Sequence, residues 1–347
     1  MSQSKVRVAV IGCGHWGPNH IRVFNSLPQS KTVMAVDSDS KRISSLQQLH
    51  PDLLFESDYR VAISDPQIDA IVVATPARSH YNIVREALEN GKHVLCEKPL
   101  CVSSEESLAL ADLAKQKQRV LAVGYVFLFN AGIRKLGELV HSGELGEILY
   151  VSVSRTNLGP IRSDVNVVFD LTTHDISILN YLLRQYPQQV SATAGSYLRK
   201  NTHDVAFINL QYKDQLIANI TASWLDPRKI RQITVVGDKK MALWDDLNMS
   251  GPVTVFDKSV IKEPQYTDYS EFLRLSIQDR DTVIPKVNLG EPLKVQNQSF
   301  LDNIINNTAP FNDAMLDYHV IRILEQINRS IESAGRALEI LSETEKS

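Results

Sequence analysis

A lysine and a histidine are the side chains of this sequence best suited to proton chemistry. Lys98 lies in residues 93–100, HVLCEKPL, where an apolar run ends at a charged pair and a proline. This pattern is typical of a buried strand that ends at the rim of a sheet. In open α/β sheets ligands bind beyond the carboxyl ends of the strands, so a lysine there meets whatever the earlier strands bind. An ordinary strand end with a solvated lysine is the alternative.

The histidine is His174, which follows Asp170 by four positions. The apolar residues after it predict a helix that opens at Asp170, so both side chains lie on one face of its first turn. A carboxylate beside an imidazole fixes the tautomer and raises the basicity of the ring, as a general base near pH 7 requires. The alternative is that Asp170 caps the helix and that His174 is an interior histidine.

A glycine-rich turn near the start of the chain predicts a site for a dinucleotide. The apolar residues 6–11 lead directly into GCGHWG at residues 12–17, and a helix is expected to follow. The first glycine allows a tight turn, the second lets a pyrophosphate approach the backbone, and the third lets helix and strand pack closely. The anion then lies at the helix N-terminus. The cofactor-binding residues predicted in this turn are Gly12, Gly14, His15, Trp16 and Gly17.

An acidic residue at the end of the second expected strand indicates which dinucleotide binds. Asp37 follows the apolar residues 32–36 and lies twenty positions beyond Gly17, where a carboxylate can accept hydrogen bonds from both ribose hydroxyls. Its charge would repel a 2′-phosphate, so NAD is expected rather than NADP. Lys41 and Arg42 would weaken that preference if they fold back. The alternative is that Asp37 caps a helix over 38–46.

Strands and helices alternate through the first third of the chain. The further elements expected there are strands at 70–74 and 119–123 and helices at 79–90 and 103–117. This alternation predicts a parallel, doubly wound sheet of the Rossmann kind. Thr75 and Pro76 then lie on its cofactor side. His80, one turn into its helix, could reach the cofactor cleft, and a surface histidine is the alternative.

The second half of the chain has a different rhythm. Alternation with period two at 216–224, together with similar runs, predicts a large open and mainly antiparallel sheet. The other elements expected are strands at 148–155, 207–212, 232–236 and 241–244 and helices at 131–141, 295–307 and 314–341. We therefore expect a dinucleotide-binding domain over 1–123 and an α+β domain over 124–347. One face of the second sheet could pair with another subunit, giving a homodimer or homotetramer.

Composition narrows the class of protein. The 347 residues are 43% hydrophobic and 22% charged, which is typical of a soluble globular protein long enough for two domains. A formal charge of −3 gives no electrostatic footprint for nucleic acid. No apolar run would span a membrane and no signal peptide opens the sequence, so we expect a cytoplasmic location and no membrane partner. The three cysteines indicate neither a disulfide framework nor a zinc site, and no metal is expected.

The three motifs together resemble the Gfo/Idh/MocA family of oxidoreductases. The motifs are GCGHWG after the first strand, EKP after the fifth, and DxxxH on a helix of a second α+β domain. The resemblance implies NAD(P)-dependent oxidation or reduction of a secondary carbinol of a sugar or cyclitol, with the active site between the domains. It assigns catalytic roles to Lys98, Asp170 and His174 and places Glu97 near the nicotinamide riboside.

Further segments resemble family members of nucleotide-sugar and surface-polysaccharide pathways. They include the stretch from Arg155 to Gly159 and the later sequence SWLDP at residues 223–227. This resemblance implies a 3-dehydrogenase of UDP-linked amino sugar acids or a 3-ketoreductase of deoxysugars. Tyr125 stands where relatives often carry histidine, which bears on substrate identity. The substrate-binding residues expected are Tyr125, Arg155, Asn157 and Asn166.

The expected chemistry is reversible hydride transfer between a sugar carbon, C3 first among the candidates, and C4 of the nicotinamide. In the oxidation direction His174 removes the hydroxyl proton, Asp170 orients the imidazole, and Lys98 donates a hydrogen bond to the reacting oxygen. Whether Lys98 or His174 takes the proton stays open. Two alternatives are kept: a dehydrogenase of free inositol or aldose, and an NAD-binding regulator of the same fold without catalysis.

Overall fold

The computed structural model describes residues 5–161, 165–200, 202–261 and 276–340. The chain divides into two compact units. Unit 1 contains Met1–Phe129 and Gly290–Arg322, and unit 2 contains Asn130–Leu289 and Ile323–Ser347. The expected division into 1–123 and 124–347 differs from this one, because a late segment packs with the first unit.

Unit 1 is built on a six-stranded sheet in the order β3-β2-β1-β4-β5-β6, in which every pair of neighbouring strands is parallel. The strands are β1 (Val6–Ile11), β2 (Ser30–Val36), β3 (Leu54–Glu56), β4 (Ala70–Val73), β5 (His93–Cys96) and β6 (Leu121–Val123). The order reverses between β1 and β4, which is the switch point where doubly wound sheets bind ligands. The prediction of a doubly wound parallel sheet is confirmed.

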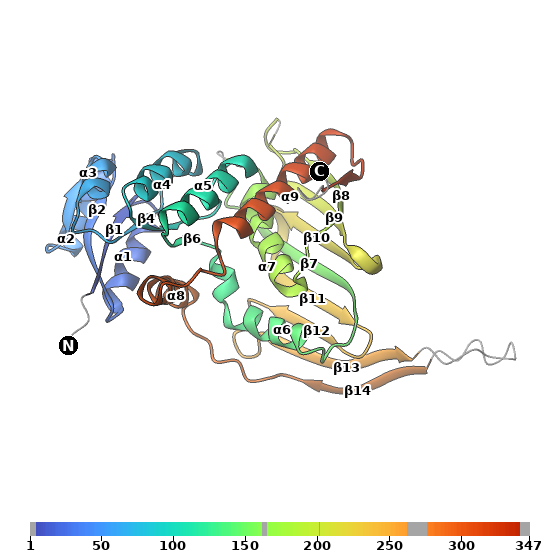
Figure 1. Ribbon diagram of the computed structural model, residues 1–347. Helices are drawn as coiled ribbons and strands as arrows, with labels where there is room; N and C mark the ends of the chain where they lie inside the picture. The colour runs from blue at the N-terminus through green and yellow to red at the C-terminus, as the bar shows by residue number, and fades with distance from the viewer. Residues whose placement is uncertain (1–4, 162–164, 201, 262–275, 341–347) are drawn as a thin grey trace, which may run out of the picture. The chain divides into compact units, whose positions relative to one another are not determined.

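Helices cover both faces of this sheet. Figure 1 shows α4 and α5 on one side of it and α1 and α8 on the other. The helices of this unit are α1 (Gly17–Ser26), α2 (Ser40–Leu49), α3 (Tyr59–Ser64), η1 (Ala77–Ser79), α4 (His80–Glu89), α5 (Ser104–Lys117), η2 (Val126–Phe129) and α8 (Pro292–Asn306). The late helix α8 belongs to the core, since Phe300 is buried against Phe24 of α1 with ring centroids 6.4 Å apart.

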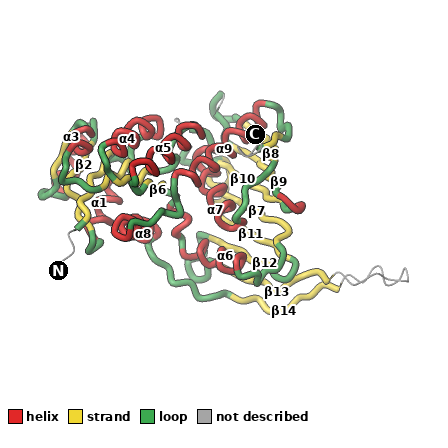
Figure 2. Tube along the Cα trace, viewed as in Figure 1, coloured by secondary structure: helices red, strands yellow, loops and turns green. Residues whose placement is uncertain are grey.

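Unit 2 is built on a nine-stranded sheet, drawn in yellow in Figure 2, in the order β14-β13-β12-β11-β7-β10-β9-β8-β15. Only β7 and β10 run parallel to one another among the pairs described. The strands are β7 (Ile148–Leu158), β8 (Gln189–Gly195), β9 (Val205–Gln211), β10 (Ile217–Ser223), β11 (Leu225–Gly237), β12 (Met241–Asp245), β13 (Val253–Ile261), β14 (Ser276–Val283) and β15 (Leu338–Glu339). The expected mainly antiparallel sheet is confirmed.

The two faces of this sheet differ. On β10, Ala218, Ile220 and Ala222 are buried, whereas Ile217 is exposed and Asn219 is half-buried, so the period of two in the sequence is present in the fold. Its helices are α6 (Ala131–His141), the π-helical turn η3 (Val168–Thr172), α7 (Thr173–Leu183) and the short η4 (Lys213–Gln215), and α9 (Ala314–Glu332) begins in unit 1 and ends here.

Two helix boundaries differ from the sequence-based expectation. The last helix, expected to reach residue 341, ends at Glu332, because Ala334 and Gly335 adopt positive φ angles of 56° and 86°. The chain then forms β15 beside β8. The helix expected to open at Asp170 begins earlier, with the π-helical turn η3. Such turns are rare and occur often at functional sites.

Cys13, Cys96 and Cys101 are all free and buried, as small apolar side chains would be. Within the described part of the chain, no helix combines the length and apolar character needed to cross a bilayer.

Candidate active site

The three glycines of the GCGHWG turn have different surroundings. A Cβ on Gly12, whose φ is +97°, would lie 2.6 Å from the Ala74 carbonyl, and a Cβ on Gly17 would lie 2.0 Å from the Gly12 oxygen. Both positions exclude a side chain because other backbone passes there. A Cβ on Gly14 would meet only the Arg42 guanidinium, 3.7 Å away. The space over Gly14 therefore fits the close approach of a ligand to the backbone.

The N-terminus of α1 is suited to an anion. Its N-cap residue Trp16 makes no side-chain capping hydrogen bond, and no acidic residue occupies the first turn. By contrast, α2 and α5 are capped by the side chains of Asp39 and Ser103. The first amides of α1 are thus available to a phosphate, which the helix dipole also favours. His15 is exposed and Trp16 half-buried beside this turn.

Asp37 follows β2 and braces the same turn. Its Oδ2 accepts a hydrogen bond from the Cys13 amide at 2.7 Å, and its Oδ1 accepts one from the Asp39 amide at 2.8 Å. The alternative that Asp37 caps α2 is wrong, because Asp39 does so by accepting from the Lys41 amide. A carboxylate offers about four lone-pair sites. Asp37 thus keeps acceptor capacity for ribose hydroxyls while it holds the glycine turn in place.

Replacing Asp37 with alanine is expected to weaken NAD binding about tenfold or more, since hydrogen bonds to a charged acceptor each contribute about 1.5–3 kcal/mol. The affinity for NADP should fall less. The Arg42 guanidinium lies 3.4 Å from the Asp37 carboxylate, so in the variant this cation would face the 2′-phosphate with no opposing negative charge. Calorimetric titration with both cofactors measures the change. The matched control is Asp39→Ala, which removes a neighbouring carboxylate that caps α2 and also pairs with Arg42 at 3.6 Å, while Asp37 stays in place. Unchanged NAD affinity in Asp37→Ala would refute the ribose contact.

Lys98 lies at the same edge of the sheet as the glycine turn. The amide of Ala74 donates to the Ile11 carbonyl and the amide of Glu97 donates to the Val73 carbonyl, both at 2.8 Å. The residues that follow β1, β4 and β5 are therefore neighbours. The half-buried Lys98 comes one residue later, and its bond to Pro99 is cis. Thr75 and Pro76, which follow β4, lie at this edge too.

Glu97 is held by two residues that the sequence did not single out. His20 of α1 places its Nε2 2.9 Å from the Glu97 carboxylate, and the Asn297 amide of α8 lies 3.2 Å from the His20 Nδ1. Since an amide nitrogen only donates, Nδ1 accepts and Nε2 carries the proton that His20 donates to Glu97. His20 and Glu97 are both buried. This chain of hydrogen bonds fixes the direction of the Glu97 carboxylate.

His80 does not face a cofactor cleft. Its ring is buried, with Nδ1 2.8 Å from the Pro99 carbonyl and Nε2 2.7 Å from the Thr75 carbonyl. Burial lowers the pKa of His80, so the neutral ring carries one N–H and can donate to only one of these carbonyls. His80 therefore matches neither the predicted cofactor contact nor the alternative of a surface histidine. It is a buried side chain that links the loop at Thr75 to the loop at Pro99.

Asp170 and His174 lie in unit 2, where η3 continues into α7. Both side chains are half-buried. The Asn166 side chain accepts a hydrogen bond from the Phe169 amide at 3.0 Å, and the Asp170 amide donates to the Asn166 carbonyl at 3.0 Å. Asn166 therefore caps this helix, and Asp170 lies inside it. The alternative role of Asp170 as the cap is excluded, whereas its role toward His174 stays a prediction.

Three loops of unit 2 meet near this helix. Ser223 at the end of β10 pairs with Thr156 of β7 and with Val205 of β9. The loops after β7, before β9 and after β10 thus leave the sheet at one edge. The Val167 amide donates to the His203 carbonyl at 2.9 Å, which joins the start of the helix to the loop before β9. Asp170 and His174 therefore lie near the loops at this end of the strands.

Several residues expected to bind substrate have other roles. Arg155 is buried, and its guanidinium pairs with Asp175 of α7 through Nε at 2.7 Å and Nη2 at 2.6 Å. This buried ion pair fastens α7 to β7. Tyr125 is 0% exposed, and its hydroxyl donates to Asp317 at 2.5 Å. Asn157, near the end of β7, donates to the Gly159 carbonyl just beyond the strand.

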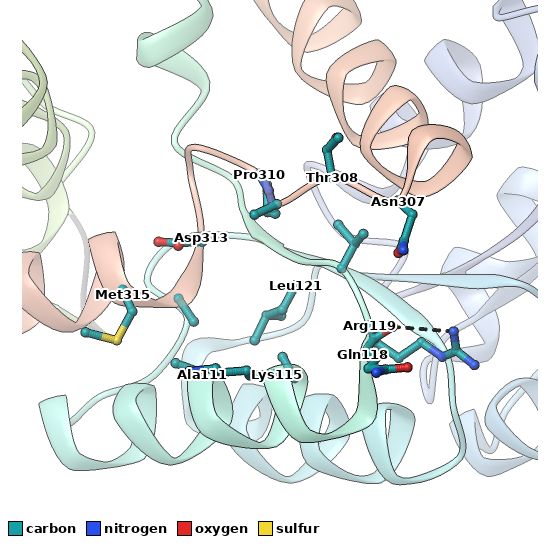
Figure 3. A pocket seen from close by; sticks show the side chains of 14 residues that line it. Ala111, Lys115, Gln118, Arg119, Leu121, Asn307, Thr308, Pro310, Asp313 and Met315 are labelled. Carbon is teal, nitrogen blue, oxygen red and sulfur yellow. Dashed lines mark hydrogen bonds between the residues drawn. The ribbon is translucent and has the colours of Figure 1, made fainter.

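A separate cavity of about 340 Å³ lies elsewhere in unit 1 (Figure 3). Its walls come from the end of α5, the residues that enter β6 and the segment between α8 and α9, including Leu121 and Pro310. Because it touches the start of β6, it lies away from the carboxyl ends of the strands and is not the predicted dinucleotide site. Among the described residues, no group of three or more His, Cys, Asp or Glu is arranged to hold a metal.

The fold and the glycine turn define an NAD-binding Rossmann domain joined to an α+β domain. Residues 6–125 match the sequence model of the oxidoreductase family with an NAD-binding Rossmann fold. Residues 133–243 match the GFO/IDH/MocA C-terminal domain. The chain therefore belongs to the Gfo/Idh/MocA family of oxidoreductases.

Known proteins resemble the chain to different extents. The scyllo-inositol 2-dehydrogenase (NAD(+)) of Bacillus subtilis is 31% identical over 188 residues, which are 52% of this chain and 55% of that protein. The chain thus spans about half the length of this curated relative. The UDP-N-acetylglucosamine 3-dehydrogenase of Acidithiobacillus ferrooxidans shares the fold, with a TM-score of 0.80 over 95% of this chain and 99% of that one at 21% identity. A levoglucosan dehydrogenase in complex with NADH and levoglucosan gives a TM-score of 0.83, with 98% and 100% coverage at 18% identity.

Proposed function

We propose that this protein is an NAD-dependent dehydrogenase or reductase acting on a secondary carbinol of a sugar. The observation that carries the proposal is the arrangement of residues at the carboxyl ends of the strands in the unit 1 sheet. There the glycine turn follows β1, Asp37 follows the adjacent strand β2, and Lys98 follows β5, which is separated from β1 only by β4. A dinucleotide bound across these strand ends would lie beside an amine. Asp170 and His174 of unit 2 supply the second half of the proposed site.

The proposed chemistry divides the proton work among three side chains. NAD, when bound, accepts a hydride from the carbinol carbon. His174 takes the hydroxyl proton, so that one hydride and one proton leave and a ketone forms. Asp170 orients the imidazole and stabilises the charge it gains. Lys98 donates a hydrogen bond to the oxygen while negative charge develops on it. In the reverse direction, the reduced cofactor would return the hydride to the ketone carbon and His174 would return the proton to the oxygen.

The substrate we propose is a nucleotide-linked sugar or sugar acid oxidised or reduced at C3. Support comes from the loops at the edge of the unit 2 sheet that carries Asp170 and His174. Arg199 and Lys200 lie in the loop before β9, and Arg228 and Lys229 lie where β11 shifts register against β7. All four are exposed. Cations gathered at one edge would attract the negative charge of a diphosphate or carboxylate.

Replacing both Arg228 and Lys229 with alanine should raise KM for a nucleotide sugar about tenfold, because each lost contact with a phosphate is a lost charge-assisted hydrogen bond. Turnover at saturation should change little, since neither side chain contacts the reacting carbon. The matched control is Lys213→Ala with Lys239→Ala. It removes two exposed cations from the opposite edge of the same sheet. Equal KM values in the two double variants would exclude a phosphate contact.

The function is tested by the absorbance of reduced nicotinamide in the presence of NAD and a panel of sugars. Turnover of UDP-linked sugars, together with inhibition by UDP, is the expected result. The relationship to a scyllo-inositol 2-dehydrogenase supports a second candidate, the dehydrogenation of a free inositol or aldose. Turnover of free polyols with no effect of UDP would establish that candidate. Binding of NAD without turnover of any sugar would indicate the regulator.

We also infer a homodimer or homotetramer formed through the open sheet of unit 2. Phe207, Ile217 and Tyr150 are 51%, 52% and 43% exposed and lie on the neighbouring strands β9, β10 and β7. Large apolar side chains gathered on one sheet face are typical of an interface. Sedimentation of the purified chain tests the inference, and a monomer would contradict it. The cytoplasm remains the expected location, to be tested by cell fractionation.

A further inference from the structure

A carboxylate is buried behind the loop that carries Lys98. Asp317, near the start of α9, is 0% exposed. It accepts hydrogen bonds from the Tyr125 hydroxyl at 2.5 Å, the Ser107 hydroxyl at 2.8 Å and the Leu100 amide at 3.2 Å. Burial raises the pKa of Asp317 to about 6, so the group is mostly ionised at pH 7. Its three donors come from three different segments of the chain.

Joining three segments of the chain through a buried carboxylate costs free energy. Removing a charge from water costs several kcal/mol, and apolar side chains of similar size often stabilise a core as well or better. What a carboxylate adds is direction, because each donor must point at one of two oxygens. The Leu100 amide is the donor that matters here. It belongs to the backbone two residues after Lys98.

The residues around Lys98 are fixed on both sides. Before it, the Glu97 carboxylate is held by His20. After it, the Pro99 carbonyl lies 2.8 Å from His80, and the Leu100 amide is held by Asp317. Side chains reach reacting groups with sub-ångström accuracy only when the backbone that carries them is itself restrained.

We propose that Asp317 is a positioning residue that sets the direction of Lys98 by holding the Leu100 amide. The proposal rests on the proposed function, in which Lys98 donates a hydrogen bond to the reacting oxygen. Asp317 lies in the late segment that returns to unit 1, 219 positions after Lys98 in the sequence. Through Asp317, this late segment would influence catalysis by positioning Lys98, although it contacts neither substrate nor cofactor.

Three single variants separate positioning from support of the fold. Asp317→Ala removes all three acceptor contacts. Asp317→Asn keeps an oxygen for the Leu100 amide and the Tyr125 hydroxyl, while its amide can donate to the Ser107 hydroxyl. Ser107→Ala removes one hydrogen bond to the same carboxylate and leaves the hydrogen bond between the Leu100 amide and Asp317 in place, so it is the matched control. For each variant we would measure kcat, KM for the sugar, the dissociation constant of NAD and the thermal midpoint.

Asp317→Ala is expected to lower kcat about tenfold or more, because a displacement of about 1 Å can cost up to about a hundredfold. NAD affinity should stay within about twofold, since the glycine turn and Asp37 are untouched. Asp317→Asn should restore kcat to within about threefold of the parent, because the hydrogen bond to Leu100 is retained. Ser107→Ala should lower the thermal midpoint and leave kcat within about twofold.

A double-variant cycle with Lys98→Ala gives the decisive comparison. If Asp317 acts through Lys98, adding Asp317→Ala to Lys98→Ala should slow the enzyme by less than about twofold more. Effects that multiply would show that Asp317 only supports the fold and would overturn the proposal. If Asp317→Ala does not fold, loss of turnover in a folded Asp317→Asn would overturn it instead. Wild-type turnover in Lys98→Ala alone would refute the proposed function, which is a separate result.

Discussion

Replacing Lys98 with alanine is expected to lower kcat at least about a hundredfold, the usual scale for losing a donor to developing negative charge. NAD affinity should change by less than about twofold, since the glycine turn and Asp37 hold the cofactor. Lys98 follows β5 on the side of the sheet where β1 and β4 also end, so we expect its amine to lie beside a nicotinamide bound there. Steady-state kinetics and calorimetric titration with NAD measure the two quantities.

The control for this variant is Lys31→Ala, which removes an exposed cation of β2. It should leave both kcat and NAD affinity unchanged. Parallel losses of NAD affinity and turnover in Lys98→Ala would assign Lys98 to cofactor binding alone. Turnover close to that of the parent would remove Lys98 from the chemistry altogether.

Replacing His174 with alanine is expected to cost at least about a hundredfold in kcat, because general bases contribute about a hundredfold to ten-thousandfold. NAD affinity should again be nearly unchanged. Added imidazole should restore part of the rate if the missing group is a base, and pre-steady-state formation of reduced nicotinamide measures that recovery directly. A defect that imidazole leaves untouched would indicate that His174 positions the substrate and does not accept its proton.

Asp170→Asn is the companion variant. An amide keeps the size of the side chain but cannot stabilise an imidazolium, so the loss should be smaller than for His174→Ala, on the order of tenfold. Because Asn166 caps this helix and Asp170 does not, the substitution should leave the helix intact. Equal losses in the two variants with a lowered thermal midpoint would indicate a defect of folding.

Local sequence patterns were sufficient for the fold class and for most of unit 1. The glycine turn depends on neighbours within a few residues, and Gly12 and Gly17 are where backbone packing leaves no room for a side chain. The start of α5 at Ser103 could also be predicted from sequence, because a capping residue is adjacent to the helix that it caps. Alternation of strands and helices predicted a parallel sheet, and period two in residues 216–224 indicated the second sheet, in which β10 covers Ile217–Ser223.

Contacts between distant segments could not be predicted in this way. Asp317 reaches the Lys98 loop, and Asn297 reaches His20 of α1, only because the late segment returns to unit 1. No spacing in the sequence signals that return. Arg155 and Tyr125 were expected at the substrate, yet Arg155 is buried against a carboxylate of α7 and Tyr125 against a carboxylate of α9. The signal for both residues was the resemblance to nucleotide-sugar members of the family. A resemblance in sequence does not distinguish a contact with a ligand from a buried polar pair.

The central claim is that Lys98 and His174 act on the same substrate oxygen beside one nicotinamide. The most direct measurement is a crystal structure with NADH and a non-reacting nucleotide sugar. We expect the Lys98 amine and the His174 ring each within about 3.2 Å of the oxygen on the reacting carbon, with that carbon facing C4 of the nicotinamide at about 3–3.5 Å. A complex in which either side chain contacts a different part of the ligand, or none of it, would contradict the claim.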